Sequence, residues 1–174
     1  MMKSTSLGIA VASLIAGIGI VASAQVVNQR PSQAKIDFAK GMANLLQNEM
    51  IAALLQEFNE TTTANAEQGK IAIGLVFNDA NPAIRLIGNL APLDPGNVPR
   101  DSFETTALNN AVKLNGTPFE AVEQSQDGNN TWFYRRSIPL SNFHPACVLC
   151  HTNFGPQNPN QWVGALTLRV PIPN

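Results

Sequence analysis

The stretch "PFEAVEQSQDGNNTWFYRRSIPL", residues 118–140, decides the fold. Two strand-like runs flank the turn sequence DGNN at 127–130, a pattern typical of an antiparallel hairpin. A third run, "QWVGALTLRVPI" at 161–172, has apolar residues at alternating positions, as a half-buried strand does. The last third of the chain therefore predicts an antiparallel sheet.

Helical patterns precede these strands. From Lys35 the sequence "KIDFAKGMANLLQNEMIAALLQEFNE" repeats apolar residues at three- and four-residue spacing, which predicts one long amphipathic helix. The apolar stripe consists of Ile36, Ala39, Met42, Ala43, Leu46, Met50, Ala53, Leu54 and Phe58. Helices followed by antiparallel strands indicate the α+β class.

The middle of the chain is less regular. "IAIGLVF" at 71–77 fits a strand or a buried helix equally, and 78–104 is dense in Pro, Gly and Asn, which predicts an ordered loop or a set of turns. A second helix is expected to begin near Asp101, capped by Asp101 or Ser102, and to end at Gly116.

The N-terminus is typical of an export signal. It has one cation at Lys3, an apolar run at 7–21, and Ala22-Ser23-Ala24 as a small-residue cleavage site. The run is shorter than the ~20 residues that span a bilayer, although a retained anchor is the alternative interpretation. We expect a signal peptide at 1–24 cleaved after Ala24, a periplasmic location without stable membrane insertion, and one domain at 25–174.

Charge excludes some partners. The chain has 11 Lys plus Arg and 12 Asp plus Glu, without long runs of either sign. Such a balance argues against a nucleic-acid or anionic-membrane partner.

The most informative motif is Cys147-Val148-Leu149-Cys150-His151, which contains both cysteines of the chain. A disulfide across two residues adds little stability, a thioredoxin-like pair needs a βαβ unit, and a zinc site needs more ligands than His144 can add. Cys-x-x-Cys-His is the signature of covalent haem attachment. We therefore expect one haem c per chain, with Cys147 and Cys150 as thioether positions and His151 as an iron ligand.

The chain resembles the periplasmic or lumenal single-haem c-type cytochromes with a PAS-like fold, which also occur as sensor domains of histidine kinases. The resemblance rests on the order of a long helix, "NPAIRLIG" at 81–88, "DPGNVPRDSFETTAL" at 94–108, "WFYRRSIPL" at 132–140, "CVLCH" at 147–151 and "WVGALTLRVPI" at 162–172. It implies a long N-terminal helix followed by a PAS-like domain with an antiparallel sheet.

Some members of this family ligate iron with a cysteine that lies shortly before an Ala-Pro pair. The corresponding stretch here is "LVFNDANPAIR", where Phe77 lies five residues before Pro82. Phe77 in the distal pocket would leave the iron five-coordinate behind an apolar wall. Met42, Met50 and, less readily, His144 are the alternative ligands.

Other side chains are expected around the porphyrin. Arg135, with Arg136, Arg85 and Arg100 as further candidates, could pair with haem propionates through a bidentate guanidinium. The aromatic residues expected to wall the porphyrin are Trp132, Phe133, Tyr134, Phe143 and Phe154.

Two functions remain open from sequence. The first is a module that senses redox state or binds a diatomic gas and signals through a separate partner protein. The second is a periplasmic electron carrier that serves a redox partner. We do not expect an enzyme, because no distal His and Arg pair of the peroxidase kind is evident.

Overall fold

The computed structural model describes residues 29–60, 62, 65, 83–88, 95–111, 116–126 and 130–174. Within these ranges lie the helices α1 (Gln33–Glu60), α3 (Ser102–Ala111) and α4 (Cys147–Cys150), the strands β1 (Ile84–Gly88), β2 (Phe119–Gln124), β3 (Trp132–Asn142) and β4 (Asn158–Ile172), and two short 3-10 turns, η1 (Pro95–Asn97) and η2 (Thr152–Phe154). The predicted signal peptide and the 71–77 run lie outside the described residues.

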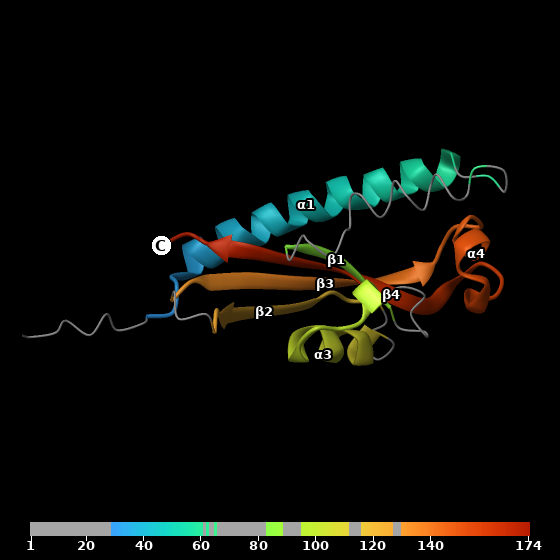
Figure 1. Cartoon of the computed structure of the whole chain (residues 1–174). Helices are drawn as coiled ribbons and strands as arrows, with labels where there is room; N and C mark the ends of the chain where they lie inside the picture. The colour runs from blue at the N-terminus through green and yellow to red at the C-terminus, as the bar shows by residue number, and fades with distance from the viewer. Residues whose placement is uncertain are drawn as a thin grey trace, which may run out of the picture.

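The four strands form one antiparallel sheet in the order β1-β4-β3-β2 (Figure 1). The expected hairpin is β2 and β3, which pair from Phe119 with Ser137 to Gln124 with Trp132. β4 lies between β1 and β3 and carries the two largest fully buried side chains of the described residues, Leu166 and Leu168. The coarse α+β class predicted from sequence is confirmed.

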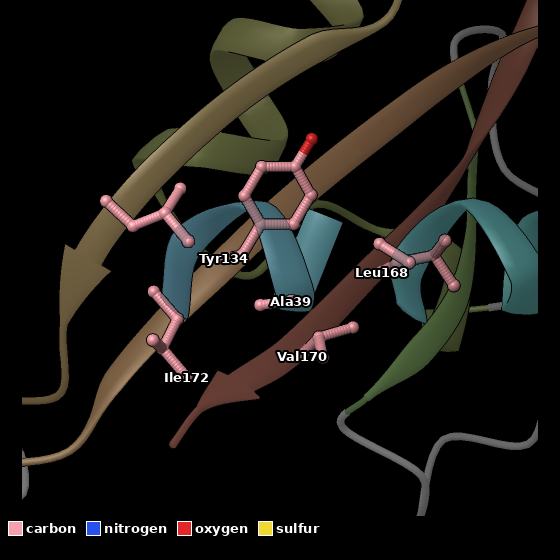
Figure 2. Packing of buried hydrophobic residues seen from close by; sticks show 7 residues of the cluster. Ala39, Tyr134, Leu168, Val170 and Ile172 are labelled. Carbon is pink, nitrogen blue, oxygen red and sulfur yellow. The ribbon is translucent and has the colours of Figure 1, made fainter. Parts of the chain in front are cut away.

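Helix α1 lies along one face of this sheet and α3 lies on the other (Figure 1). Side chains alternate between the faces of a strand, so Tyr134, Ile138, Leu168 and Val170 point toward α1. Ala39 and Ala43 are fully buried against them, and the small alanine side chains let the helix approach the sheet closely (Figure 2). This packing forms the main hydrophobic core.

The predicted apolar stripe lies within α1, and one of its members is misassigned. Ile36, Ala39, Ala43 and Leu54 are buried, as expected, whereas Met42 is 39 % exposed. Met42 precedes Ala43 by one position, or about 100° around a helix, so the two cannot both face the sheet.

The prediction of loops and turns for 78–104 is wrong in one part. Ile84–Gly88 forms strand β1, paired with β4 from Ile84 opposite Leu168 to Gly88 opposite Gly164. The five residues IRLIG alternate between intermediate and buried, a half-buried strand pattern too short to stand out among the surrounding prolines and glycines.

Helix α3 begins where sequence predicts, with Asp101 as its cap. The Oδ1 atom of Asp101 accepts a hydrogen bond from the backbone N–H of Glu104 at 2.9 Å. Phe103 on α3 packs on Phe119 of β2, with ring centroids 5.1 Å apart. The helix therefore holds its acidic first turn against the sheet.

Candidate functional site

The two cysteines and both histidines lie in the connection between β3 and β4, at the end of the molecule opposite the C-terminus (Figure 1). The fully buried Asn142 closes the base of this connection, because its Nδ2 donates to the carbonyl oxygens of Pro156 at 3.0 Å and Gly155 at 3.2 Å. Register shifts on either side of Ser141 allow the strand to bend there. The connection is thus an ordered loop.

Within the loop, the motif forms a single helical turn, α4. Backbone N–H groups of Cys147 and His151 donate to the carbonyl oxygens of His144 at 3.0 Å and of Cys147 at 2.9 Å. The Nδ1 of His144 accepts a hydrogen bond from the backbone N–H of Ala146 at 3.1 Å, which fixes the turn before the motif. The backbone therefore places residues 147, 150 and 151 within one turn.

Cys147 and His151 both line a pocket of about 110 Å³. The walls are mainly apolar: Leu54 and Phe58 of α1, Leu86, Ile87 and Gly88 of β1, Leu140 of β3, Phe143 and Phe154 of the loop, and Val163, Gly164 and Ala165 of β4. The pocket is therefore built where the last turns of α1, the β1–β4 pair and the cysteine loop meet.

Aromatic rings hold His151 and the loop in place. The imidazole of His151 is stacked on the ring of Phe154, with centroids 4.4 Å apart and planes 3° from parallel. Phe58 of α1 lies 5.8 Å from both the Phe143 ring and the His144 ring. These contacts join the loop to α1.

Electrostatics favour the neutral imidazole at this place. Burial lowers the pKa of His151, because an apolar environment disfavours the charged ring. A neutral imidazole carries a lone pair on one nitrogen and is the form that binds metals. Cys147 is also buried, at 6 % exposure.

Arg135 lies in a different part of the molecule. Its guanidinium donates to Asp101 at 2.6 Å and to Glu123 at 2.9 Å, and lies 4.2 Å from the centroid of the Phe103 ring. Ser141, which lines the pocket, is six positions further along β3, about 20 Å away. The structure thus does not bring Arg135 together with Cys147 and His151.

None of the three further candidate cations lines the pocket that contains Cys147 and His151. Arg85 is paired with Glu104 beside Arg135, and Arg100 lines the same cavity as these two. Arg136 pairs with Glu120 and donates to Gln47 of α1 at 2.8 Å. Phe77, the expected distal residue, lies outside the described residues.

Of the expected aromatic wall, Phe143 and Phe154 line the pocket. Trp132, Phe133 and Tyr134 lie at the other end of β3, where Tyr134 belongs to the core under α1. Sequence reasoning did not assign Leu54 or Phe58 to the site. The only signal was their place at the end of the apolar stripe, which says nothing about a loop some 90 residues further along.

The residues that the structure describes contain no group of three or more His, Cys, Asp or Glu side chains arranged to hold a metal ion, and no helix among them is long and apolar enough to cross a membrane. No family model, no curated protein and no solved structure matches the chain.

Proposed function

We propose that the chain is an exported monohaem c-type cytochrome that acts as a redox-sensing or diatomic-gas-binding module. The observation that carries this proposal is the pocket in which Cys147 and His151 of a Cys-x-x-Cys-His motif meet apolar walls from α1, β1 and β4. In this proposal Cys147 and Cys150 would hold the haem through thioethers, and an imidazole nitrogen of His151 would bind its iron.

The chemistry of the pocket fits a porphyrin edge. Its lining is dominated by aliphatic and phenyl side chains, the surroundings that a flat apolar macrocycle requires. The pocket of about 110 Å³ is smaller than the 300–1,000 Å³ of typical ligand sites, so its described walls enclose only one edge of such a group. When bound, haem c supplies a one-electron ferric/ferrous couple and an iron position for small ligands.

The chain's own residues orient and shield this edge. Phe154 stacks on His151 and fixes the plane of the imidazole, while burial keeps that ring neutral and able to bind metal. Leu54 and Phe58 exclude water from the side facing α1. Phe77 as an apolar distal residue remains part of the proposal.

Helix α1 supports the sensory role. Its 28 residues extend about 42 Å, and Phe58 at the pocket lies about 33 Å along the helix from Ile36, in the core at the opposite end of the sheet. A change at the pocket can therefore be passed along one rigid element to a separate signalling partner. The finer PAS-like description belongs to this proposal and is supported by an antiparallel sheet with α1 on one face and α3 on the other.

Exposure of the loop favours the alternative function of periplasmic electron carrier. Thr152, Asn153 and residues 155–160 are exposed around the motif, and Leu149 is 37 % exposed. A haem edge near such a surface could pass electrons to a redox partner.

The test of haem attachment uses the only two histidines of the chain as a matched pair. We expect Cys147→Ser with Cys150→Ser to abolish covalent haem in cells that mature c-type cytochromes. His151→Ala should give a mis-ligated spectrum, while His144→Ala should keep that of the parent. Equal spectra for both histidine variants would contradict the assigned ligand.

Carbon monoxide distinguishes the two functions. A module with an open distal side should bind CO rapidly in the ferrous state, whereas a six-coordinate carrier should resist it. Resistance would favour the carrier and point to Met50, which packs beside Leu54 at the pocket. Met50→Ala should then open the iron to CO, and the exposed Met42 provides the control, Met42→Ala.

A further inference from the structure

A second and larger cavity, of about 440 Å³, lies on the α3 side of the sheet. Its charged lining consists of Arg85, Arg100, Arg135 and Arg169 as cations and Asp101, Glu104 and Glu123 as anions. We call it the arginine cavity. Four cations face three anions, so this lining has one positive charge in excess.

Strand register places two of these cations against each other. Arg135 of β3 and Arg169 of β4 are direct partners across the strands, so both side chains leave the same face of the sheet. Like charges at directly opposite positions destabilise a sheet unless anions offset them.

The carboxylates of the cavity offset the charge of only one of these two arginines. Arg135 is bound by Asp101 and Glu123 and lies 3.8 Å from Glu104. The guanidinium of Arg169 instead lies over the Phe133 ring, with its central carbon 3.7 Å from the ring centroid, and has no carboxylate partner in the described part of the chain. Arg169 is therefore a cation of the arginine cavity whose charge no carboxylate of the described residues offsets.

The deeper arginines also leave donors unused. Arg85 and Arg135 are 4 % and 6 % exposed, and within the described residues the Nε atom of each lacks a hydrogen-bond acceptor. Buried donors without acceptors cost free energy, but these two Nε atoms are closed off from solvent and do not themselves select a ligand. The excess positive charge of the lining is what favours an anion.

We propose that the arginine cavity binds a small organic carboxylate, with the guanidinium of Arg169 as its principal partner. A guanidinium presents paired N–H groups that match the two oxygens of a carboxylate. The volume lies within the range of small-molecule sites. This site is separate from the haem pocket and does not rest on the proposed haem function.

Calorimetric titration of the protein as purified with acetate, succinate and citrate, at matched ionic strength, tests the proposal. At least one of the three should bind with one site per chain. Arg169→Gln should weaken that binding about tenfold or more, the loss expected for one charge-assisted contact. The control Lys40→Gln removes an equal charge from α1 on the opposite face and should leave affinity unchanged.

Arg169→Lys is a second variant that separates lost binding from lost folding, because it keeps the positive charge but removes the paired N–H groups of the guanidinium. We expect it to fold like the parent by circular dichroism and to bind with intermediate affinity. The proposal is overturned if none of the three carboxylates binds, if sulfate binds as tightly as they do, or if Arg169→Gln and Arg169→Lys both retain the parent's affinity.

Discussion

Replacing Glu104 with glutamine tests how much the structure depends on its buried charges. Glu104 is 3 % exposed, and one carboxylate oxygen accepts hydrogen bonds from the Arg85 guanidinium and from the backbone N–H of Arg100, the latter at 2.8 Å. Glu104→Gln keeps the shape and removes the charge, which leaves the buried Arg85 guanidinium without its carboxylate partner; Arg135 keeps Asp101 and Glu123. We expect the free energy of unfolding to fall by about 3–5 kcal/mol, as for other broken buried pairs.

Glu120 provides the matched control. It also pairs with an arginine, Arg136, and with Lys40, but its side chain is 29 % exposed. Water screens such pairs, so Glu120→Gln should cost no more than about 1 kcal/mol. Urea unfolding followed by circular dichroism measures both variants. Equal losses, or a loss below about 1 kcal/mol for Glu104→Gln, would refute the argument that burial decides the effect.

Three further predictions concern the core and the pocket. Leu166→Ala opens a cavity in the central strand at a fully buried position and should cost about 3–5 kcal/mol in urea unfolding; a cost below about 1 kcal/mol would show that this site is not packed. Gly164→Ala places a methyl group against the carbonyl of Ile87, so it should cost about 1–3 kcal/mol and reduce haem yield, and an unchanged yield would contradict the close β1–β4 approach. Burial, reinforced by the nearby negative charge of Glu120, raises the pKa of Tyr134, the only tyrosine of the sequence, to about 12 from 10. Its neutral form therefore stabilises the fold fully below pH 10, and about 2–3 kcal/mol should be lost between pH 10 and 12, whereas NMR titration with a midpoint near 10 in folded protein would exclude this.

Sequence reasoning located the β2–β3 hairpin because the turn and both flanking runs are local signals. It missed β1 because that strand is short and is specified by its pairing with β4, about 80 residues away. For the site, the Cys-x-x-Cys-His motif could be found from the sequence because all its residues lie within five consecutive positions. The sequence could not predict that Leu54 and Val163 line the same pocket as His151, because only tertiary packing brings these residues together.

Arg135 illustrates a second limit. Successive side chains of β3 point to opposite faces of the sheet, and Arg135 directly follows the core residue Tyr134. This pattern could have placed Arg135 on the face opposite α1. The sequence does not indicate which face or which end of the sheet lies next to the loop at 143–157 that contains the cysteines. Pairing with Asp101 also required α3 to lie over that face.

Burial by itself would raise the pKa of Asp101, but the hydrogen bond and charge of Arg135 outweigh it and hold that pKa below its ordinary value.

Intact mass of the protein purified from an exporting host that matures c-type cytochromes tests the haem assignment most directly. After denaturation and acid-acetone extraction, we expect the mass of residues 25–174 plus one haem, with the chromophore retained on a denaturing gel and lost in the variant with Cys147→Ser and Cys150→Ser. A colourless polypeptide mass after extraction, with the haem recovered in the solvent, would contradict covalent attachment at this motif.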